Sequence, residues 1–270
     1  MTPDRQDANL LLSTQGSDGV LRLTLNDPDR RNALSEAMLV ALDETFDAAS
    51  TNPDVRVIVL AAVGPVFCAG HDLKEMTTGR QNADRGRAYF TKILNQCSSV
   101  MQKIVTCPKP VIAEIDGVAT AAGCQLVASC DLAVASETAQ FCTPGVHIGL
   151  FCSTPMVALS RNLANKHAME MLLTGDMVSA SRAAEMGLIN QVVPSADLCA
   201  GSMALAGKIA AKSSFTVATG KRAFYQQKEM DLEAAYNYAS KIMVDNMLAR
   251  DAKEGIAAFI EKRVPDWHDE

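Results

Sequence analysis

The first quarter of the chain combines an alternating segment with a helical stripe. In VLRLTLN (20–26) apolar and polar residues alternate, which predicts a strand with one buried face. Apolar residues then recur at helical spacing between Ser35, a residue type that caps helix N-termini, and Pro53, which does not continue a helix. We therefore expect a helix between these two residues, with a buried face formed by Leu39, Leu42, Phe46 and Ala49.

Three more apolar runs predict strands of a buried sheet. Residues 55–63 are almost continuously apolar, the pattern of a strand covered on both faces. Residues 110–116 and 131–136 are shorter runs bounded by turn residues. Strands interspersed with helices predict an α/β fold. Helical spacing appears between and after these runs, near residues 84–106, 121–129, 154–173 and 180–187.

From about residue 197 onward the pattern is entirely helical. Asp251 and Glu254 have the spacing of a capping box at the start of the last helix. The sequence thus predicts an α/β body over residues 1–196 and a helical region over residues 197–270. The apolar stripe expected on the last helix consists of Ile256, Phe259 and Ile260.

Composition and charge exclude several classes of function. The 270 residues carry a formal net charge of −6 at pH 7 without a dense block of Lys and Arg, so nucleic acid is not an expected partner. No apolar run approaches the roughly 18–20 residues of a membrane span. The first ten residues lack the basic and apolar regions of a secretory signal. We expect a cytoplasmic protein, with the mitochondrial matrix after processing as the alternative.

The cysteines and histidines give no sign of a metal site. None of the eight cysteines forms a C-x-x-C pair, so we expect reduced thiols and no disulfide framework. The four histidines, at positions 71, 147, 167 and 268, lack metal-ligand spacing. We expect no metal and no tightly bound cofactor.

Two loops rich in Gly and Ala each follow a predicted strand. They are FCAGHDLKEM (67–76) and GVATAAGCQLV (117–127). N–H groups at a strand-to-helix junction have no partner within the helix, so one from each loop can hold the negative oxygen of a polarised carbonyl. Small residues are equally explained by tight packing of strand against helix, and the loops alone do not decide. Neither loop matches a nucleotide-phosphate motif.

Five segments of the chain occur in a characteristic order. They are FCAGHDLKEM, KPVIAEIDGVATAAGCQLVASCDLAVAS, FCTPGVHIGL, LLTGDMVSASRAAEMGLINQVVP and EGIAAFIEKR. Together they resemble the crotonase (enoyl-CoA hydratase/isomerase) superfamily, and the resemblance covers roughly residues 18 to 265. It implies a spiral of β-β-α units with a C-terminal helical region that forms homotrimers, often paired into hexamers. It also implies that the ligand is an acyl-CoA thioester, with coenzyme A as part of the substrate.

The resemblance assigns the two oxyanion donors to the backbone N–H groups of His71 and Ala122. It implies that CoA runs past Arg31 and Ala33, with Lys74 near the nucleotide. Phe259 and Lys262, of the same or a neighbouring subunit, are implied to touch adenine or phosphate. Both lysines are explained as well by solvated surface positions, and Asp72 by helix capping. The other residues implied to line the site are Ala69, Asp72, Leu73, Ala121, Gly123, Pro144, His147 and Cys152.

Hydratases of the superfamily use two glutamates, and this chain has neither. The corresponding positions hold Gln125 and Gly145. A glutamine exchanges no proton near neutral pH and a glycine has no side chain, so neither supplies general acid–base catalysis. Such catalysis is typically worth about 10²–10⁴-fold per group. The sequence therefore argues against hydration by the usual mechanism.

His71 is the strongest replacement for the missing acid or base, because imidazole titrates near neutral pH. G-H-D at residues 70–72 also resembles an acyl-CoA decarboxylase branch of the superfamily, although that branch has a tyrosine near the position of Cys152. The alternative for His71 is a backbone donor whose ring only packs. A structural role is favoured for His147, and a core role over a nucleophilic one for Cys152 and Cys124.

Three functions remain open on the sequence. The first is an acyl-CoA enzyme that stabilises an enolate or oxyanion, with an unassigned acid or base. The second is an acyl-CoA-binding protein without turnover, which the loss of both carboxylates favours. The third is decarboxylation or thioester hydrolysis assisted by His71. RNA binding, known for one relative in the superfamily, is disfavoured by the acidic charge.

Overall fold

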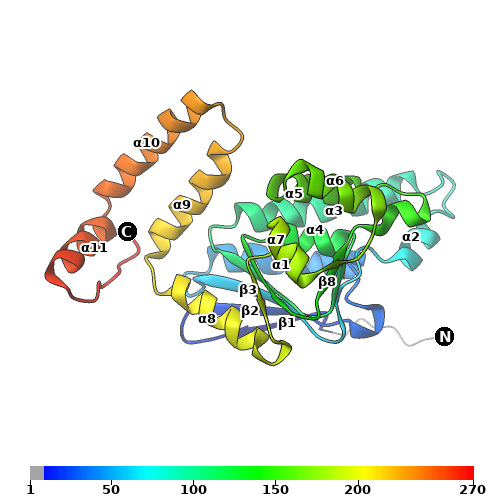
Figure 1. Cartoon of the computed structure of the whole chain (residues 1–270), viewed down its shortest axis with the longest axis horizontal. Helices are drawn as coiled ribbons and strands as arrows, with labels where there is room; N and C mark the ends of the chain where they lie inside the picture. The colour runs from blue at the N-terminus through cyan, green and yellow to red at the C-terminus, as the bar shows by residue number, and fades with distance from the viewer. Residues whose placement is uncertain (1–8) are drawn as a thin grey trace.

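The structure is a computed structural model that describes residues 9–270 (Figure 1). The interpretation of the N-terminus falls largely on residues 1–8, which lie outside the described residues. The strands are β1 (Leu11–Gln15), β2 (Val20–Leu25), β3 (Val57–Ala62), β4 (Val66–Cys68), β5 (Val111–Ile115), β6 (Val118–Thr120), β7 (Leu132–Ser136), β8 (Gln140–Cys142), β9 (Val178–Ser179) and β10 (Gln191–Val193).

Helices follow most of these strands. The α-helices are α1 (Glu36–Thr51), α2 (Leu73–Gly79), α3 (Arg87–Thr106), α4 (Ala122–Ser129), α5 (Ser153–Asn162), α6 (Asn165–Thr174), α7 (Ala180–Met186), α8 (Leu198–Ala210), α9 (Ser214–Gln227), α10 (Leu232–Leu248) and α11 (Arg250–Glu261). The 3-10 helices are η1 (Pro28–Arg30), η2 (Pro144–Ile148) and η3 (Ser195–Asp197).

Two sheets organise the body of the molecule. The larger has the strand order β1-β2-β3-β5-β7-β10 and the smaller β4-β6-β8-β9. The β1–β2 and β8–β9 pairs are antiparallel and the others are parallel. Three times, a strand of the larger sheet is followed by one of the smaller sheet and then by a helix: β3-β4-α2, β5-β6-α4 and β7-β8-η2. This repeat confirms the predicted spiral of β-β-α units.

The predicted helix after Ser35 is confirmed as α1. The Ser35 hydroxyl accepts a hydrogen bond from the N–H of Met38 (3.2 Å), and the expected apolar stripe is buried. The helix expected over residues 154–173 is instead two helices, α5 and α6. Asn162, at the break, donates from its side chain to the carbonyls of Ala128 (2.7 Å) and Ala158 (2.8 Å). This amide ties the end of α5 to α4.

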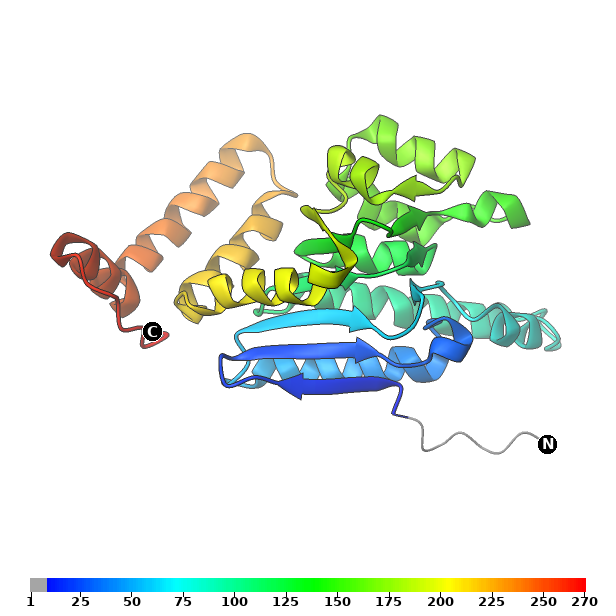
Figure 2. The ribbon, with the colours of Figure 1, turned by 60° about the horizontal axis from the view of Figure 1, so that its bottom comes forward.

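The larger sheet is covered on both faces. The main core packs against one face, with contributions from α1, α3 and α4. Helix α8 covers the other, as Figure 2 shows. The strand predicted over 55–63 is confirmed as β3, five of whose six residues are buried. The apolar residues between α8 and the sheet are Val20, Val57, Val59, Ile112, Val134, Leu198, Ala206 and Ala210.

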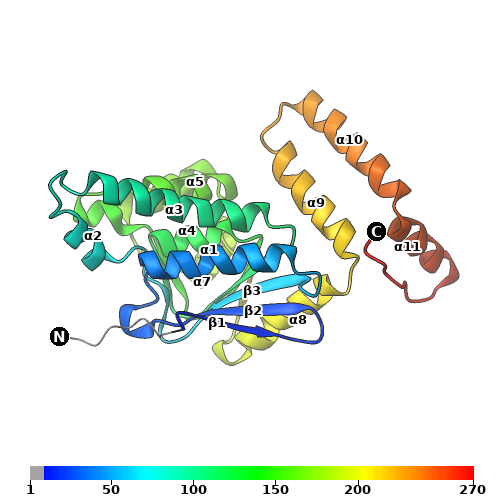
Figure 3. The ribbon, with the colours of Figure 1, turned by 180° about the vertical axis from the view of Figure 1, so that it is seen from behind.

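Helices α9, α10 and α11, here called the C-terminal arm, project from the body on the side away from α2 (Figures 1 and 3). The predicted capping box is wrong, because α11 begins after Ala249 without a side-chain cap. The carboxylate of Asp251 accepts instead from the N–H groups of His268 and Asp269, which fixes the chain end against α11. Glu254 pairs with Arg263 (2.5 Å). The stripe expected on α11 is largely exposed at Ile256, Phe259 and Ile260.

Candidate functional site

The two small-residue loops lie directly against each other. Gly70 has a φ of +83°, and a Cβ on it would lie 3.1 Å from the backbone nitrogen of Ala122. A Cβ on Gly123 would lie 2.1 Å from the carbonyl oxygen of Cys68, so α4 packs onto β4 at backbone distance. Tight packing of strand and helix therefore explains the small residues. The same contact brings the two loops together.

Each loop presents a backbone N–H at a helix start. Ala122 is the first residue of α4, and His71 comes two residues before α2. Within residues 9–270 neither N–H has a hydrogen-bond acceptor. Ala121, just before α4, has φ 53° and ψ −119° and donates to the carbonyl of Cys142 (2.9 Å). Such a conformation costs a non-glycine residue about 1–3 kcal/mol and is typical of functional sites.

The segment around Arg31 runs beside the first loop. The N–H of Ala69 donates to the carbonyl of Arg31 (3.1 Å), and the N–H of Leu34 donates to that of Gly70 (2.8 Å). Ala33, between them, is buried. The structure therefore brings Arg31 and Ala33 next to the His71 loop.

Asp72 caps α2. Its Oδ1 accepts from the N–H groups of Lys74 (2.8 Å) and Glu75 (3.2 Å), and its Oδ2 forms an ion pair with Arg30 (2.5 Å). The capping role is confirmed. Leu73 and Lys74 follow it on the exposed side of α2.

Asn32 is a positioning residue that the sequence analysis missed. It is fully buried, and its side-chain nitrogen donates to the carbonyls of Val63 (2.9 Å) and Val66 (2.8 Å). Its side-chain oxygen accepts from the N–H of Asp27 (2.8 Å). The amide thus joins the Arg31 segment to the ends of β3 and β4. The available signal was an asparagine in a loop, a residue type that tolerates the left-handed conformation found here, with φ 50°.

Two polar side chains at this junction are buried without a well-aligned partner. Both ring nitrogens of His71 and Oε1 of Gln125 lack a well-aligned hydrogen bond among the described residues, although the Leu34 backbone lies close enough to the His71 ring to oppose the lowering of its pKa. Burial lowers the pKa of His71, so its imidazole is neutral at pH 7. Gln125 is 4% exposed. A buried polar group without a partner costs about 1–3 kcal/mol.

The position of the second missing glutamate is closed. A Cβ on Gly145 would lie 2.9 Å from the sulfur of Cys152 and 2.9 Å from the carbonyl oxygen of Leu150. The N–H of Leu150 donates to the carbonyl of Gly145 (2.9 Å), which holds the returning chain in place. Cys152 thus fills the space that a side chain at 145 would enter.

The thiols near Gly145 are not activated. Cys124, Cys142 and Cys152 are close enough to interact with one another. Burial raises the pKa of each of them, so none is a thiolate at neutral pH. Their environment favours the core role that the sequence analysis gave to Cys124 and Cys152.

His147 and Pro144 connect η2 to α6. The Nε2 of His147 lies 2.8 Å from the carbonyl oxygen of Thr174. A Cβ on Gly175 would lie 3.0 Å from the α-carbon of Pro144 and 3.1 Å from the His147 ring. These contacts hold η2, and with it Gly145, against the end of α6.

A single chain does not bring all the expected CoA-binding residues together. Lys74 is on α2, whereas Phe259 is on α11 and Lys262 follows it. These elements lie at opposite ends of the molecule in Figures 1 and 3. Phe259 is 85% exposed.

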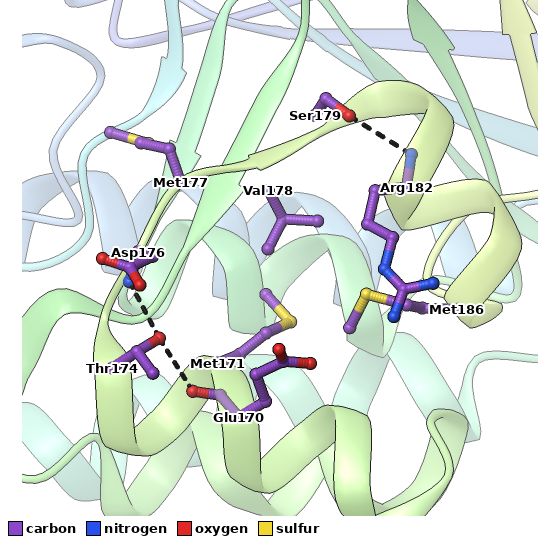
Figure 4. A pocket seen from close by; sticks show the side chains of 9 residues that line it. All are labelled: Glu170, Met171, Thr174, Asp176, Met177, Val178, Ser179, Arg182 and Met186. Carbon is purple, nitrogen blue, oxygen red and sulfur yellow. Dashed lines mark hydrogen bonds between the residues drawn. The ribbon is translucent and has the colours of Figure 1, made fainter.

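Two cavities lie away from the two loops. One, of about 350 Å³, is lined by Met171, Met186, Glu170 and Arg182, among others, between α6 and α7 (Figure 4). The other, of about 440 Å³, lies between α9 and the end of α3. Over residues 9–270, no group of three or more His, Cys, Asp or Glu side chains is arranged to hold a metal ion. None of the helices described is long and apolar enough to span a membrane.

The chain is similar to a well-defined set of proteins. The family model of enoyl-CoA hydratase/isomerase matches residues 15–270. Enoyl-CoA hydratase domain-containing protein 3, mitochondrial, is 50% identical in Mus musculus, over 95% of this chain and 84% of that protein. The human protein of the same name is 48% identical, over 96% and 84%. The segments GHDLKEM, AAGCQLVASCD and GLFCSTP already resemble this protein.

Solved structures of enoyl-CoA hydratases and of the human relative are also similar to this chain. An enoyl-CoA hydratase from Mycobacterium smegmatis has a TM-score of 0.92 and 51% identity, covering 97% of this chain and all of that one. Human enoyl-CoA hydratase domain-containing protein 3 has a TM-score of 0.90 and 47% identity, covering 96% and 100%. The names of the mouse and human relatives place those proteins in mitochondria. This agrees with the mitochondrial matrix, the alternative expected from the sequence, and not with the cytoplasm, the location expected first.

Proposed function

The chain belongs to the enoyl-CoA hydratase/isomerase family, and from this premise we propose that it binds an acyl-CoA thioester and stabilises negative charge on the thioester oxygen. One observation carries the proposal: the His71 and Ala122 loops touch, and each presents a backbone N–H without an acceptor among the described residues. Two such donors in a buried setting polarise a carbonyl and hold an enolate oxygen.

Hydration by two carboxylates is not part of the proposal. Gln125 supplies no exchangeable proton at neutral pH, and Gly145 has no side chain. The sulfur of Cys152 would lie 2.9 Å from a Cβ at position 145, so a longer side chain does not fit there without a shift of the loop. The neutral imidazole of His71 is the remaining base at the junction, which supports enolate chemistry, decarboxylation or hydrolysis.

A second candidate is an acyl-CoA-binding protein without turnover. The specific observation in its favour is that Gln125 and Gly145, where hydratases of the family have glutamates, provide neither an acid nor a base. It uses the same donors, so it predicts the same binding but no consumption of any thioester.

We also propose that the protein works as an oligomer, as the family generally does, with a homotrimer or a pair of trimers as the form. The distance of α11 from α2 within one chain supports a neighbouring subunit as the source of Phe259 and Lys262 at the CoA site. The apolar residues exposed on the arm support contact with another copy.

The decisive experiment compares two ligands that differ only in the carbonyl. We expect butyryl-CoA to bind about tenfold more tightly than its thioether analogue S-butyl-CoA, because only the thioester offers the donors an acceptor. Calorimetry on the full chain measures both. Equal affinities contradict the proposed donors. Mass spectrometry of a panel of acyl-CoA thioesters then separates turnover from binding alone.

A further inference from the structure

Helix α11 carries two faces of different character. The residues of the first face recur every three or four positions, so they lie on one side of the helix: Asp251, Glu254, Gly255 and Ala258. The second face is apolar and exposed, and it consists of Ile256, Phe259 and Ile260. The direction in which the second face points therefore depends on what holds the first.

Residues 263–270, here called the tail, fold back over the first face. The carboxylate of Asp251 accepts from the N–H groups of His268 (2.8 Å) and Asp269 (2.9 Å). The carboxylate of Glu254 accepts from the N–H of Asp266 (2.9 Å). Hydrogen bonds to an ionised acceptor are stronger than those to a neutral one. The backbone of the tail is thus bound to two successive turns of α11.

Trp267 extends these contacts to the link between α8 and α9. A Cβ on Gly255 would lie 3.0 Å from the indole ring, so the ring packs directly on the backbone of α11. The Nε1 of the indole donates to the carbonyl of Ala211 (3.0 Å), which lies in that link. The side chain therefore connects the first face of α11 to the point where the C-terminal arm leaves the body.

Asp269 joins the tail to the body. Its carboxylate accepts from the N–H of Ser214 (2.7 Å), the first residue of α9, and pairs with Arg56 (2.7 Å), which precedes β3. The guanidinium of Arg56 also donates to the carbonyls of Ala210 (2.8 Å) and Lys212 (2.6 Å). One cation of the body thus binds both the end of α8 and the tail. Figure 3 shows the tail returning from α11 to the start of α9.

These contacts close a ring of chain segments. Helix α9 leads through α10 to α11, and the tail leads back from α11 to the start of α9. The link between α10 and α11 is the single residue Ala249, which holds α11 only at its start. The tail binds α11 along a whole face, and it therefore fixes the rotation of this helix about its axis.

We propose that the tail is a positioning element for ligand binding: by holding the first face of α11, it directs Phe259 toward the nucleotide part of CoA on a neighbouring subunit. The inference rests on the proposed function and adds the residues that orient α11 without touching the ligand. Phe259 is exposed, and Lys262 directly precedes the tail. An aromatic ring stacks on a base only when its face is turned toward that base, so the rotation of α11 sets the affinity for the nucleotide. Arg56, Trp267 and Asp269 are the positioning residues.

The first test separates the nucleotide from the rest of the ligand. Butyryl-pantetheine carries the same thioester as butyryl-CoA but lacks the adenosine and phosphate groups. Calorimetry on the full chain measures both dissociation constants, and we expect the parent to bind butyryl-CoA at least tenfold more tightly. In Trp267→Ala and Asp269→Ala this preference should fall at least threefold, with the affinity for butyryl-pantetheine unchanged. Trp267→Phe keeps a ring against Gly255 and should retain most of the preference.

Asp266→Ala is the matched control for Asp269→Ala. The Asp266 side chain is 88% exposed, and the substitution keeps the backbone N–H that contacts α11. Its preference should equal that of the parent. Unchanged affinity for butyryl-pantetheine reports that the body of each variant is folded. If the parent binds neither ligand, the proposed function fails. If the parent binds both equally, or if folded Trp267→Ala and Asp269→Ala keep its preference, the inference is overturned and the proposed function stands.

The second test asks whether the tail acts through Phe259. Phe259→Ala alone should reduce the preference for butyryl-CoA, and adding Trp267→Ala should then cost a smaller factor than it does in the parent. Equal factors with and without Phe259→Ala overturn the inference, because the tail then acts elsewhere. Sedimentation velocity on the same samples measures the assembly of each variant. A loss of preference confined to dissociated protein assigns the tail to assembly and likewise overturns the positioning role.

Discussion

The carbonyl oxygen of Cys68 faces the α-carbon of Gly123 so closely that a Cβ there would lie 2.1 Å from it. Cys68 ends β4, and Gly123 is the second residue of α4. The contact therefore fixes the first turn of α4 against the strand that leads into the His71 loop. Because the backbone is involved on both sides, no rotation of a side chain relieves an added methyl group.

We expect Gly123→Ala to destabilise the protein by about 1–3 kcal/mol or more, because either α4 or β4 must move. The loss should appear as a lower melting temperature and as weaker binding of butyryl-CoA. Gly220→Ala on exposed α9 is the matched control, since a Cβ there meets nothing within 4 Å. The control should gain up to about 1 kcal/mol from helix propensity. A Gly123→Ala variant as stable as the parent contradicts the close approach.

The sequence predicted the elements that have a long and regular pattern. The stripe after Ser35 and the continuous apolar run of β3 are examples, because burial of one or both faces governs their composition. The strands β4, β6 and β8 have three residues each, too few to display a period. Strand β1 was missed because only its first residue, Leu11, is buried. The false capping box arose because Asp251 and Glu254 bind the chain end instead, a contact that spacing does not reveal.

The sequence predicted which backbone segments form the candidate site, but not how several of its side chains are placed. The small-residue loops identified the junction of Gly70 and Ala122 because strand-to-helix turns leave N–H groups unpaired. The role of Asn32 and the placement of Cys152 against Gly145 depend on chain segments that return from elsewhere in the fold. Such contacts have no signature in local sequence.

Gly145→Glu should not produce hydratase activity. The new Cβ would contact the sulfur of Cys152 and the backbone oxygen of Leu150, each at 2.9 Å, so the loop must shift. We expect a stability loss of about 1–3 kcal/mol from overpacking. The double variant Gln125→Glu, Gly145→Glu should show no loss of enoyl-thioester absorbance with crotonyl-CoA. Adding Cys152→Ala should recover part of the stability, because it removes the sulfur contact. Rapid hydration by the double variant refutes this account.

Glu254 should make the stability of the arm sensitive to acid. The guanidinium of Arg263 and the N–H of Asp266 lower the pKa of Glu254 from its ordinary 4.5 to about 2. A lowered pKa contributes stability above the ordinary value, and that stability is lost as the pH falls through about 2. The melting temperature of the parent should exceed that of Glu254→Gln at pH 7, and the difference should shrink between pH 4.5 and 2. When both proteins also carry Arg263→Met, the difference in melting temperature caused by Glu254→Gln should be smaller at pH 7 and vary less with pH. A difference that stays constant with pH rules the pair out as its source.

Lys221 anchors the arm to the body, and its removal should be costly. Its ammonium group donates to the carbonyls of Ile104 and Lys109, each at 3.0 Å, and forms a buried ion pair with Asp131 at 2.6 Å. Tyr225 donates to the other oxygen of the same carboxylate at 3.0 Å. Lys221→Met leaves this carboxylate without its cation, which costs about 3–5 kcal/mol in a buried pair.

Denaturant unfolding of three variants tests the cost of losing Lys221. Tyr225→Phe removes one hydrogen bond and should cost less than Lys221→Met, about 1.5–3 kcal/mol, because the acceptor is charged. The double variant Lys221→Met, Asp131→Asn should recover part of the loss, since no uncompensated charge remains. Arg182→Ala, which breaks the exposed pair with Glu185, should change the free energy of unfolding by at most about 1 kcal/mol. If Lys221→Met costs no more than Arg182→Ala, the buried pair does not hold the arm.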